Sequence, residues 1–331
     1  MDFQALDFVR QLSLSHFVSR SLHVAAELDV AGVVPEGGAD IAEVARKTGV
    51  NADALGRVLR LLASRGIFKL EGERVSNTAY SLFLRDDHPA SLRPLVRNFG
   101  QEILWRFSGA LMHSVKTGES VSERVHPDGG LWGYRNQHPE VGAIFDVAME
   151  AKARGAIAAI LGAYDFTPYG TVVDVGGGMG HLIRAIVGKY PALNGVLFDQ
   201  PAVIDRAKAR GEDSRVSLIA GDFFSTAIPA GDLFVLMDII HDWDDESSGK
   251  ILQAVRRAMP PTGRVAIIEV EMVEGEEPHF SKLLDILMMV NFGARQRTNA
   301  QYEALLRANG FLPAGVTRAG AEIVIVEGTA A

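Results

Sequence analysis

The chain has 331 residues, of which 47% are hydrophobic and 22% are charged, a composition typical of a globular protein with a large core and room for two domains. It contains no cysteine, which excludes disulfides, thiolate nucleophiles and cysteine-ligated zinc. Its net charge of −8 gives no reason to expect nucleic acid or another polyanion as a partner.

The hydropathy pattern predicts neither a membrane segment nor a leader. No segment approaches the roughly 20 uninterrupted apolar residues that span a bilayer. The first residues, MDFQALDFVRQLSLSHF, carry acidic side chains where a signal peptide has a basic region, and they lack its compact apolar core. We therefore expect a cytoplasmic protein without membrane association.

The N-terminal part of the chain predicts a helix-turn-helix followed by a wing. Residues 1 to about 35 follow a helical pattern; a short helix is then expected to end at Gly49, and a longer one at Gly66. Residues 67–70 and 74–76 are typical of the two strands of a hairpin. Together these elements predict a winged helix.

A winged helix raises the question of DNA binding, and the longer helix is expected to carry Arg57, Arg60 and Arg65. Residues 1–90, however, hold 10 Lys and Arg against 12 Asp and Glu, a balance of −2, whereas a DNA-binding module has a clustered basic surface. The stretch from Leu12 to Val34 is also more apolar than a small winged helix can bury alone. We therefore expect this module to form a homodimer rather than to bind DNA.

Residues 92 to about 162 predict further helices that are rich in aromatic side chains. Aromatic residues at helical spacing are more often part of a core than of a pocket. Their place between the winged module and the rest of the chain favours a pocket wall, because ligand sites occur at domain interfaces. Both interpretations stay open for this set: Phe99, Trp105, Phe107, Trp132, Tyr134 and Phe145.

The stretch TVVDVGGGMG, residues 171–180, predicts a buried strand, a tight glycine turn and the start of a helix. The dinucleotide fingerprint G-x-G-x-x-G fails here, because its last glycine would fall on His181. The pattern present is D-x-G-x-G-x-G, from Asp174 through Gly176 and Gly178, and it resembles the first motif of the S-adenosylmethionine (SAM) methyltransferases. In a nucleotide-binding unit an acidic residue ends the next strand, and Asp199 occupies that position.

Apolar runs alternate with helical patterns through the rest of the chain. Strands are expected near residues 172–175, 195–198, 216–220, 233–237, 264–269 and 321–327. This alternation predicts an α/β fold with a doubly wound parallel sheet, whose ligands bind at the carboxyl ends of the strands. Residues at or just past such ends should converge, and they are Asp199, Asp222, His241 and Glu269.

The acidic segment HDWDDE, residues 241–246, follows one of these apolar runs. A carboxylate-bound metal is an alternative here, but consecutive residues rarely face one ion, and acids before an apolar helical pattern are typical of a helix N-terminus. We therefore expect no metal and assign His241 to chemistry as a general base. Glu269 is the candidate for holding its ring in the required tautomer.

Six segments, VVDVGGGMG, FDQP, GDFF, HDWDDE, PPTGRVAIIE and RQRT, follow the order and spacing of one family. The chain resembles the metal-independent SAM-dependent O-methyltransferases of the plant caffeate and bacterial polyketide-tailoring type, over nearly its whole length and including an N-terminal winged-helix dimerisation domain. The resemblance implies a Rossmann-like catalytic domain, SAM as cofactor and a hydroxylated aromatic small molecule as methyl acceptor. The implied division is a dimerisation domain over residues 1–100, linking helices over 101–162 and a SAM-binding domain over 163–331.

The resemblance also implies roles for single residues. The first motif, with Asp174, Gly176 and Gly178, lies beside SAM, Asp199 holds the ribose, and Asp222 and Phe223 frame the adenine. His241 is the base and Glu269 orients it. The positions implied to contact the acceptor are Trp105, Phe145, Met149, Leu287 and Asn291.

Two positions depart from the family pattern. Gln296 replaces a second glutamate beside the histidine, so it can hydrogen-bond the ring but adds no negative charge, and base strength should rest more on Glu269. Met237 replaces a lysine on the cofactor side. C- or N-methylation, or another SAM-dependent reaction of the same fold, is therefore the alternative to O-methylation, and a SAM-sensing winged-helix regulator is the alternative of another class.

Overall fold

The computed structural model describes residues 2–211 and 213–331, which fold into two compact units. The first unit contains the chain up to Trp105 together with His138–Lys152, and the second contains Arg106–Gln137 and the chain from Ala153 onward. Two helices, α7 (Glu102–Gly109) and α11 (Pro139–Ala163), have residues in both units. None of the helices in the described ranges is long and apolar enough to cross a bilayer.

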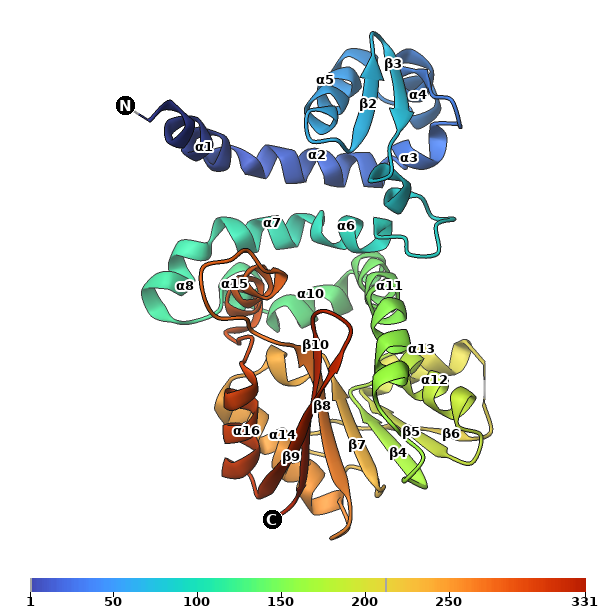
Figure 1. The fold of residues 1–331 in the computed structure, drawn as a ribbon, viewed down its shortest axis with the longest axis vertical. Coiled ribbons are helices and arrows are strands. Elements are labelled where there is room, and N and C mark those ends of the chain that lie inside the picture. The colour runs from blue at the N-terminus through green and yellow to red at the C-terminus, as the bar shows by residue number, and fades with distance from the viewer. Residues whose placement is uncertain (1, 212) are drawn as a thin grey trace. The chain divides into compact units, whose positions relative to one another are not determined.

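The first unit is mostly helical, with the hairpin of β2 and β3 beside α4 and α5 (Figure 1), and its sheet has three strands in the order β1-β3-β2. Its hairpin pairs Phe68 with Asn77 and Leu70 with Val75, which confirms the predicted wing. The two-residue strand β1 was not predicted. The elements are α1 (Phe3–Ser13), α2 (Ser15–Glu27), α3 (Val30–Val33), β1 (Ala39–Asp40), α4 (Ile41–Thr48), α5 (Ala52–Ala63), β2 (Phe68–Glu71), β3 (Arg74–Asn77), η1 (Ser81–Leu84) and α6 (Arg93–Phe99).

Local sequence signals set the ends of the two central helices. Gly49 adopts the left-handed conformation, with φ 72°, that ends α4. Asn51 begins α5 by accepting a hydrogen bond from the amide of Ala54 at 3.0 Å. α5 ends before Arg65, so that arginine lies outside the helix on which we expected it. The α5 leucines that face the core are those that the spacing predicts: Leu55, Leu59 and Leu62.

Seven strands form the main sheet of the second unit, in the order β6-β5-β4-β7-β8-β10-β9. The first five strands in this order are parallel, whereas β10 runs antiparallel to both β8 and β9. The expected parallel sheet is therefore wrong at one edge, and the sheet is mixed. The strands are β4 (Thr171–Val175), β5 (Asn194–Asp199), β6 (Val216–Ala220), β7 (Leu233–Met237), β8 (Arg264–Val270), β9 (Phe311–Ala319) and β10 (Ile323–Ala330).

β9 was not predicted because its sequence contains two residues that disfavour strands. Pro313 has no backbone N–H, and Gly315 adopts a φ of 147°, which L side chains rarely take. The strand lies at the edge of the sheet, where a missing donor is tolerated. The register of the partner strand β10 shifts between Glu327 and Gly328, opposite these residues. An irregular edge ladder thus accommodates a sequence without a strand pattern.

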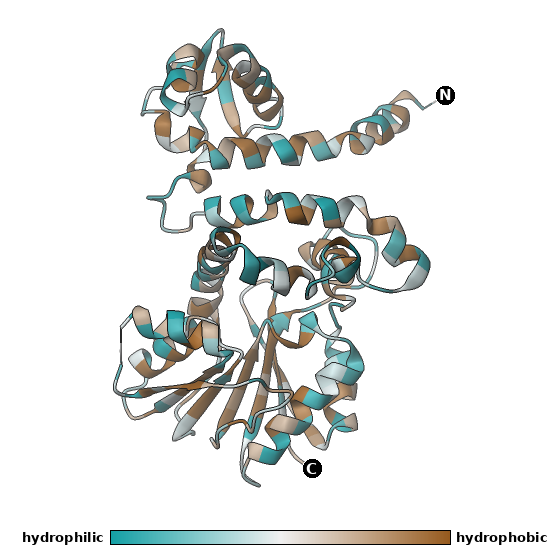
Figure 2. Ribbon diagram, turned by 180° about the vertical axis from the view of Figure 1, so that it is seen from behind, coloured by the Kyte–Doolittle hydropathy of each residue, from teal (hydrophilic) through white to brown (hydrophobic). Residues whose placement is uncertain are grey.

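Helices cover both faces of the main sheet (Figure 1). On one face, α12, α13 and the end of α11 pack against Val172 and Leu197; on the other, α14 and α16 pack against Val173 and Val175. Neighbouring residues of a strand point to opposite faces of the sheet. Because helices cover both faces, both sets of residues must be apolar, and most of the sheet is accordingly brown in Figure 2. The helices are α8 (Leu111–Thr117), α9 (Ser122–Val125), α10 (Gly130–Gln137), α12 (His181–Lys189), α13 (Pro201–Ala209), η2 (Ile240–Asp242), α14 (Asp245–Ala258), α15 (Phe280–Phe292) and α16 (Asn299–Ala308).

The strand order reverses around β4, which has β5 on one side and β7 on the other. The chain moves outward from β4 to β5 and β6, and then crosses to the opposite side at β7. In open α/β sheets ligands bind at such a switch point, beyond the carboxyl ends of the strands. The connections that follow β4 and β7 are therefore the first place to look for the site.

Candidate active site

The turn between β4 and α12 depends on glycine. Gly176, Gly178 and Gly180 have φ angles of 71°, 59° and 77°, in the left-handed region that residues with a Cβ avoid. A Cβ at Gly176 would lie 2.5 Å from the side chain of Ile239, so the chain is closely packed there. A Cβ at Gly178 would meet no described atom within 4 Å. The turn is therefore packed at its start and open at Gly178.

Asp174 lies in β4 just before this turn, and it is almost fully buried. Neither of its carboxyl oxygens has a hydrogen-bond partner among the described residues. Burial raises the pKa of Asp174 to about 7, and the charge of Asp199 adds to the shift. A Cβ at Gly177 would lie 2.5 Å from this carboxyl group. The sequence therefore buries an unpartnered acid beside a turn in which only glycine fits.

Asp199 links this turn to the end of β5. One of its carboxylate oxygens accepts a hydrogen bond from the amide of Gly178 at 2.8 Å, and the other accepts from the amide of Gln200 at 2.7 Å. These two hydrogen bonds hold the Asp199 carboxylate at the end of β5, beside the glycine turn. Asp222, just past β6, similarly accepts from the amide of Phe224 at 2.9 Å. The predicted acids thus stand at the carboxyl ends of neighbouring strands.

Aromatic side chains lie beside the start of the glycine turn. Phe223 and Trp243 make an edge-to-face contact with ring centroids 5.9 Å apart, and Phe224 makes one with Trp243 at 4.8 Å. Phe223 is also 3.8 Å from the position that a Cβ of Gly176 would take. Met237, the last residue of β7, is half-buried against the core on one face of the sheet. This part of the site is therefore apolar.

His241 lies in the short helix η2 that follows β7, and its side chain is buried. Its Nδ1 lies 3.1 Å from Oε2 of Glu269 and 2.8 Å from Nε2 of Gln296. Glu269 comes from β8, and Gln296 comes from the segment between α15 and α16. The structure thus brings the three predicted catalytic side chains together from three distant parts of the sequence.

Glu269 holds the backbone near His241 as well as the ring. Its Oε1 accepts hydrogen bonds from the amides of Ile239 at 3.1 Å and of His241 at 3.2 Å. Gln296 is fixed in turn, because its backbone N–H donates a hydrogen bond to the carboxylate of Asp285 at 2.8 Å. Glu269 thus contacts both the backbone and the ring of His241.

Two further carboxylates lie on the Nε2 side of the ring: Asp242 at 3.6 Å and Asp238 at 4.0 Å. Asp238 was not predicted; it adopts a φ of 55°, which is uncommon for a residue with a Cβ, although aspartate tolerates it. Asp238, His241 and Glu269 are near enough to one another to suggest a metal site. Glu269 faces Nδ1 at 3.1 Å and Asp238 faces Nε2 at 4.0 Å, so the two carboxylates approach different nitrogens of the ring.

Trp105, an expected acceptor contact, lies in the first unit with its polar atom already bonded. Its indole N–H donates to Nδ1 of His23 at 3.3 Å, and the guanidinium of Arg20 lies 5.4 Å from its ring centre. Burial and the charge of Arg20 lower the pKa of His23 to about 4, so this ring accepts in its neutral form. The other expected contacts are Phe145 and Met149 on α11 in the first unit, and Leu287 and Asn291 on α15 in the second.

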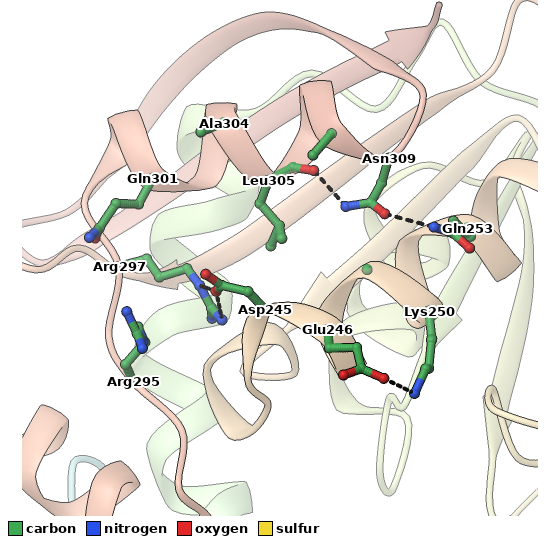
Figure 3. A pocket seen from close by; sticks show the side chains of 12 residues that line it. Asp245, Glu246, Lys250, Gln253, Arg295, Arg297, Gln301, Ala304, Leu305 and Asn309 are labelled. Carbon is green, nitrogen blue, oxygen red and sulfur yellow. Dashed lines mark hydrogen bonds and ion pairs between the residues drawn. The ribbon is translucent and has the colours of Figure 1, made fainter. Parts of the chain in front are cut away.

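A cavity of about 580 Å³ lies between α14 and α16 (Figure 3). Its lining includes Asp245, Arg295 and Arg297. It includes neither His241 nor Glu269 nor Gln296. Sequence analysis gave no role to Arg297, although the segment RQRT contains it. Its significance depends on the burial of its guanidinium, which no local pattern reveals.

Two family patterns match the chain: the O-methyltransferase domain over residues 109–312 and the O-methyltransferase dimerisation domain over residues 10–86. The phenazine O-methyltransferase PhzM of Lysobacter antibioticus is 38% identical over 322 residues, which cover 96% of this chain and 94% of that protein. The 8-amino-8-demethylriboflavin N,N-dimethyltransferase of Streptomyces davaonensis is 30% identical over 317 residues, 92% of this chain and 90% of that protein. Among solved structures, the O-methyltransferase NcsB1 from neocarzinostatin biosynthesis, in complex with SAM and 2-hydroxy-5-methyl naphthoic acid, is 30% identical with a TM-score of 0.82, covering 95% of this chain and 96% of that one.

The chain therefore belongs to the O-methyltransferase family. It is a SAM-dependent methyltransferase, as the sequence resemblance implied, and it carries the family's N-terminal dimerisation domain. The end of β4 and the turn that follows it fit the cofactor. Gly178 leaves open space, and Asp174 has a buried carboxyl group without a hydrogen-bond partner among the described residues.

Proposed function

We propose that the protein methylates a hydroxyl group of an aromatic small molecule, with His241 as the general base. The contact of Nδ1 with Glu269 and Gln296 carries this proposal, because it fixes the ring and assigns proton transfer to the opposite nitrogen, Nε2. The aromatic class is inferred from the relatives, since one is named for phenazine methylation and another binds a naphthoic acid.

The proposed chemistry requires a base because a phenol, with a pKa near 10, is a weak nucleophile until its proton leaves. SAM, when bound, supplies an electrophilic methyl group. With Nδ1–H directed at Glu269, Nε2 of His241 accepts the phenolic proton as the oxygen attacks. The carboxylate of Glu269, 3.1 Å from Nδ1, then stabilises the imidazolium. Gln296 would then present its side-chain oxygen to the same Nδ1–H, so it orients the ring without adding charge.

The turn after β4 is the proposed cofactor site. Asp174, Gly176 and Gly178 would lie beside SAM, and Asp199 would hold the ribose hydroxyls. Phe223 and Asp222 would frame the adenine ring, and Met237 on the cofactor side offers no charge. The residues proposed to contact the acceptor are those implied by the resemblance: Trp105, Phe145, Met149, Leu287 and Asn291.

The first prediction tests the base. His241→Ala should lower kcat by about 10²-fold or more with little change in SAM affinity, because the lost interaction belongs to the transition state. Glu269→Gln should cost nearly as much, because it removes the negative charge that faces Nδ1. The measurement is transfer of labelled methyl from SAM to a set of hydroxynaphthoates and hydroxyphenazines, with calorimetry of SAM binding. A His241→Ala enzyme that retains most of its activity would contradict the role of base.

N-methylation is the second candidate, favoured by the 30% identical N,N-dimethyltransferase and by the neutral Gln296. An amine that is already neutral needs no base before it attacks, so activity would then depend on positioning alone. Aminonaphthoates assayed beside the hydroxynaphthoates, with the methylated atom identified by NMR, separate the two candidates. Methyl on nitrogen together with an active His241→Ala variant would replace the first proposal by the second.

A further inference from the structure

The guanidinium of Arg297 is buried against the backbone that carries His241. Its Nη1 donates to the carbonyl oxygen of Ile240 at 2.9 Å, and its Nη2 donates to the carbonyl oxygen of Trp243, also at 2.9 Å. These carbonyls lie immediately before His241 and two residues after it. Asp245, at the start of α14, accepts from Nη2 at 2.7 Å and from Nε at 3.1 Å (Figure 3).

The segment around His241 is therefore held from two sides. Glu269 accepts hydrogen bonds from the amides of Ile239 and His241, whereas Arg297 donates hydrogen bonds to the carbonyls of Ile240 and Trp243. An anion thus binds the N–H groups of the segment, and a cation binds its C=O groups. Such opposed contacts leave the backbone little freedom to rotate the imidazole.

Arg297 also directly follows the residue that contacts the ring. Gln296 reaches Nδ1 of His241 at 2.8 Å, and the next side chain secures the backbone of the same histidine. Gln296 and Arg297 are adjacent in the chain, so a shift of one displaces the other. The position of the His241 ring is therefore coupled to the position of the backbone around it.

We infer that Arg297 is a positioning residue for His241, which it holds in the orientation for proton transfer. The inference rests on the proposed function, because it takes His241 as the base. Only 1% of the arginine is exposed, whereas the side chain of its carboxylate partner Asp245 is 66% exposed. Burial of the guanidinium costs desolvation free energy, and a solvent-exposed carboxylate offsets this cost only in part. The arrangement therefore needs another gain, which we assign to the positioning of His241.

The fork of the guanidinium explains why arginine occupies this position. Three nitrogens in one plane reach two carbonyls and a carboxylate, whereas a lysine has a single nitrogen and cannot occupy the three directions at once. Arg297→Lys keeps the charge but removes this geometry. Arg295→Lys is the matched control, because Arg295 is exposed and lines the same cavity two residues earlier (Figure 3).

The experiment measures the ring directly and then the reaction. The full-length protein is labelled with ¹⁵N-histidine, and the His241 signals are identified by their absence in His241→Ala. We expect Arg297→Lys to shift or broaden these signals and to lower kcat by about 10²-fold, since a displacement of about 1 Å can cost that much. SAM affinity should stay within about twofold, because the cofactor residues are not touched by Arg297. Arg295→Lys should leave all three quantities unchanged.

Each outcome decides the inference. Unchanged His241 signals and kcat in Arg297→Lys, with only the unfolding temperature lowered, would overturn it. Should Arg297→Lys not fold, Asp245→Ala takes its place, because it removes the carboxylate that orients the guanidinium through Nη2 and Nε; unmoved His241 signals in that variant would likewise refute the inference. A fully active His241→Ala enzyme would instead refute the proposed function. The NMR comparison would still test whether Arg297 positions the His241 ring.

Discussion

Negative charge surrounds both nitrogens of the His241 ring. Glu269 faces Nδ1 at 3.1 Å, while Asp242 and Asp238 lie 3.6 and 4.0 Å from Nε2. The sequence alone led us to expect that Glu269 would be the sole acid supporting the imidazolium, because Gln296 replaces a glutamate. Asp238 and Asp242 lie on the other side of the ring, so Glu269 is not the only carboxylate near it among the described residues.

Asp174 makes stability depend on pH at the level of a single residue. Burial raises its pKa to about 7, whereas in the unfolded chain the pKa is near 3.9. Between these values the folded protein binds more protons than the unfolded chain. The contribution of Asp174 to stability is therefore fully present below about pH 4 and is lost as the pH rises to about 7.

Asp174→Asn tests this second prediction, because an amide of similar shape does not titrate. The unfolding free energy of the variant, relative to the native protein, should rise between pH 5 and pH 8, by at most ~4 kcal/mol at about 1.4 kcal/mol per pKa unit. Urea unfolding of both proteins across this range measures the difference. Parallel pH dependences would show that Asp174 is ionised in the folded state throughout.

The turn between β4 and α12 carries the third prediction, at the level of an element. Gly178→Val places a branched side chain in the open space at this glycine and strains a φ of 59°. Asp199→Ala removes the acceptor that binds the amide of Gly178. SAM affinity measured by calorimetry should fall by about tenfold or more in both variants, by the role of these positions in nucleotide-binding units.

Gly188 provides the control for the valine substitution. It lies in α12, has no described atom within 4 Å of a Cβ position, and adopts an ordinary helical φ. Gly188→Val should therefore leave SAM affinity unchanged, and valine costs less than glycine in a helix. Equal losses of affinity in Gly178→Val and Gly188→Val would mean that the effect is not local to the turn.

The elements that the sequence predicts well are those with a local signal. Asp199, His241 and Glu269 could be placed at strand ends because each follows an apolar run that forms a buried strand. β9 could not be predicted, since Pro313 and Gly315 hide a strand that exists only through its pairing with β10.

Two features of the site itself also escaped prediction. Asp238 is distinguished by its positive φ, and Arg297 is distinguished by the burial of its charged guanidinium. Both properties arise from tertiary contacts between segments far apart in the chain. A period of apolar residues cannot encode them, so a sequence pattern finds the reacting groups more readily than the groups that position them.

At the scale of the whole molecule, the first unit leaves an apolar surface on α1 and at the start of α2. Large apolar side chains there are exposed although they recur at helical spacing: Phe3, Leu6, Phe8, Val9, Leu12, Leu14 and Phe17. The match of residues 10–86 to a dimerisation domain overlaps this surface. A stable interface buries about 800 Å² of surface on each partner. The exposed apolar side chains of α1 and α2 can contribute to a buried surface of this size. We therefore expect a homodimer that uses α1 and α2.

The last prediction follows from the exposure of single leucines on this surface. Leu12 is 60% exposed, so Leu12→Asp should leave each subunit folded while placing an uncompensated charge in the dimer interface. Leu312, which is 57% exposed on β9, provides the matched control, and Leu312→Asp should keep the native assembly. Light scattering at micromolar concentration should give a dimer for the native protein and the control, and a shift toward monomer for Leu12→Asp. A native protein that is monomeric at this concentration would refute the dimer, whereas a truncation lacking residues 1–35 that stays dimeric and active would refute the use of α1 and α2.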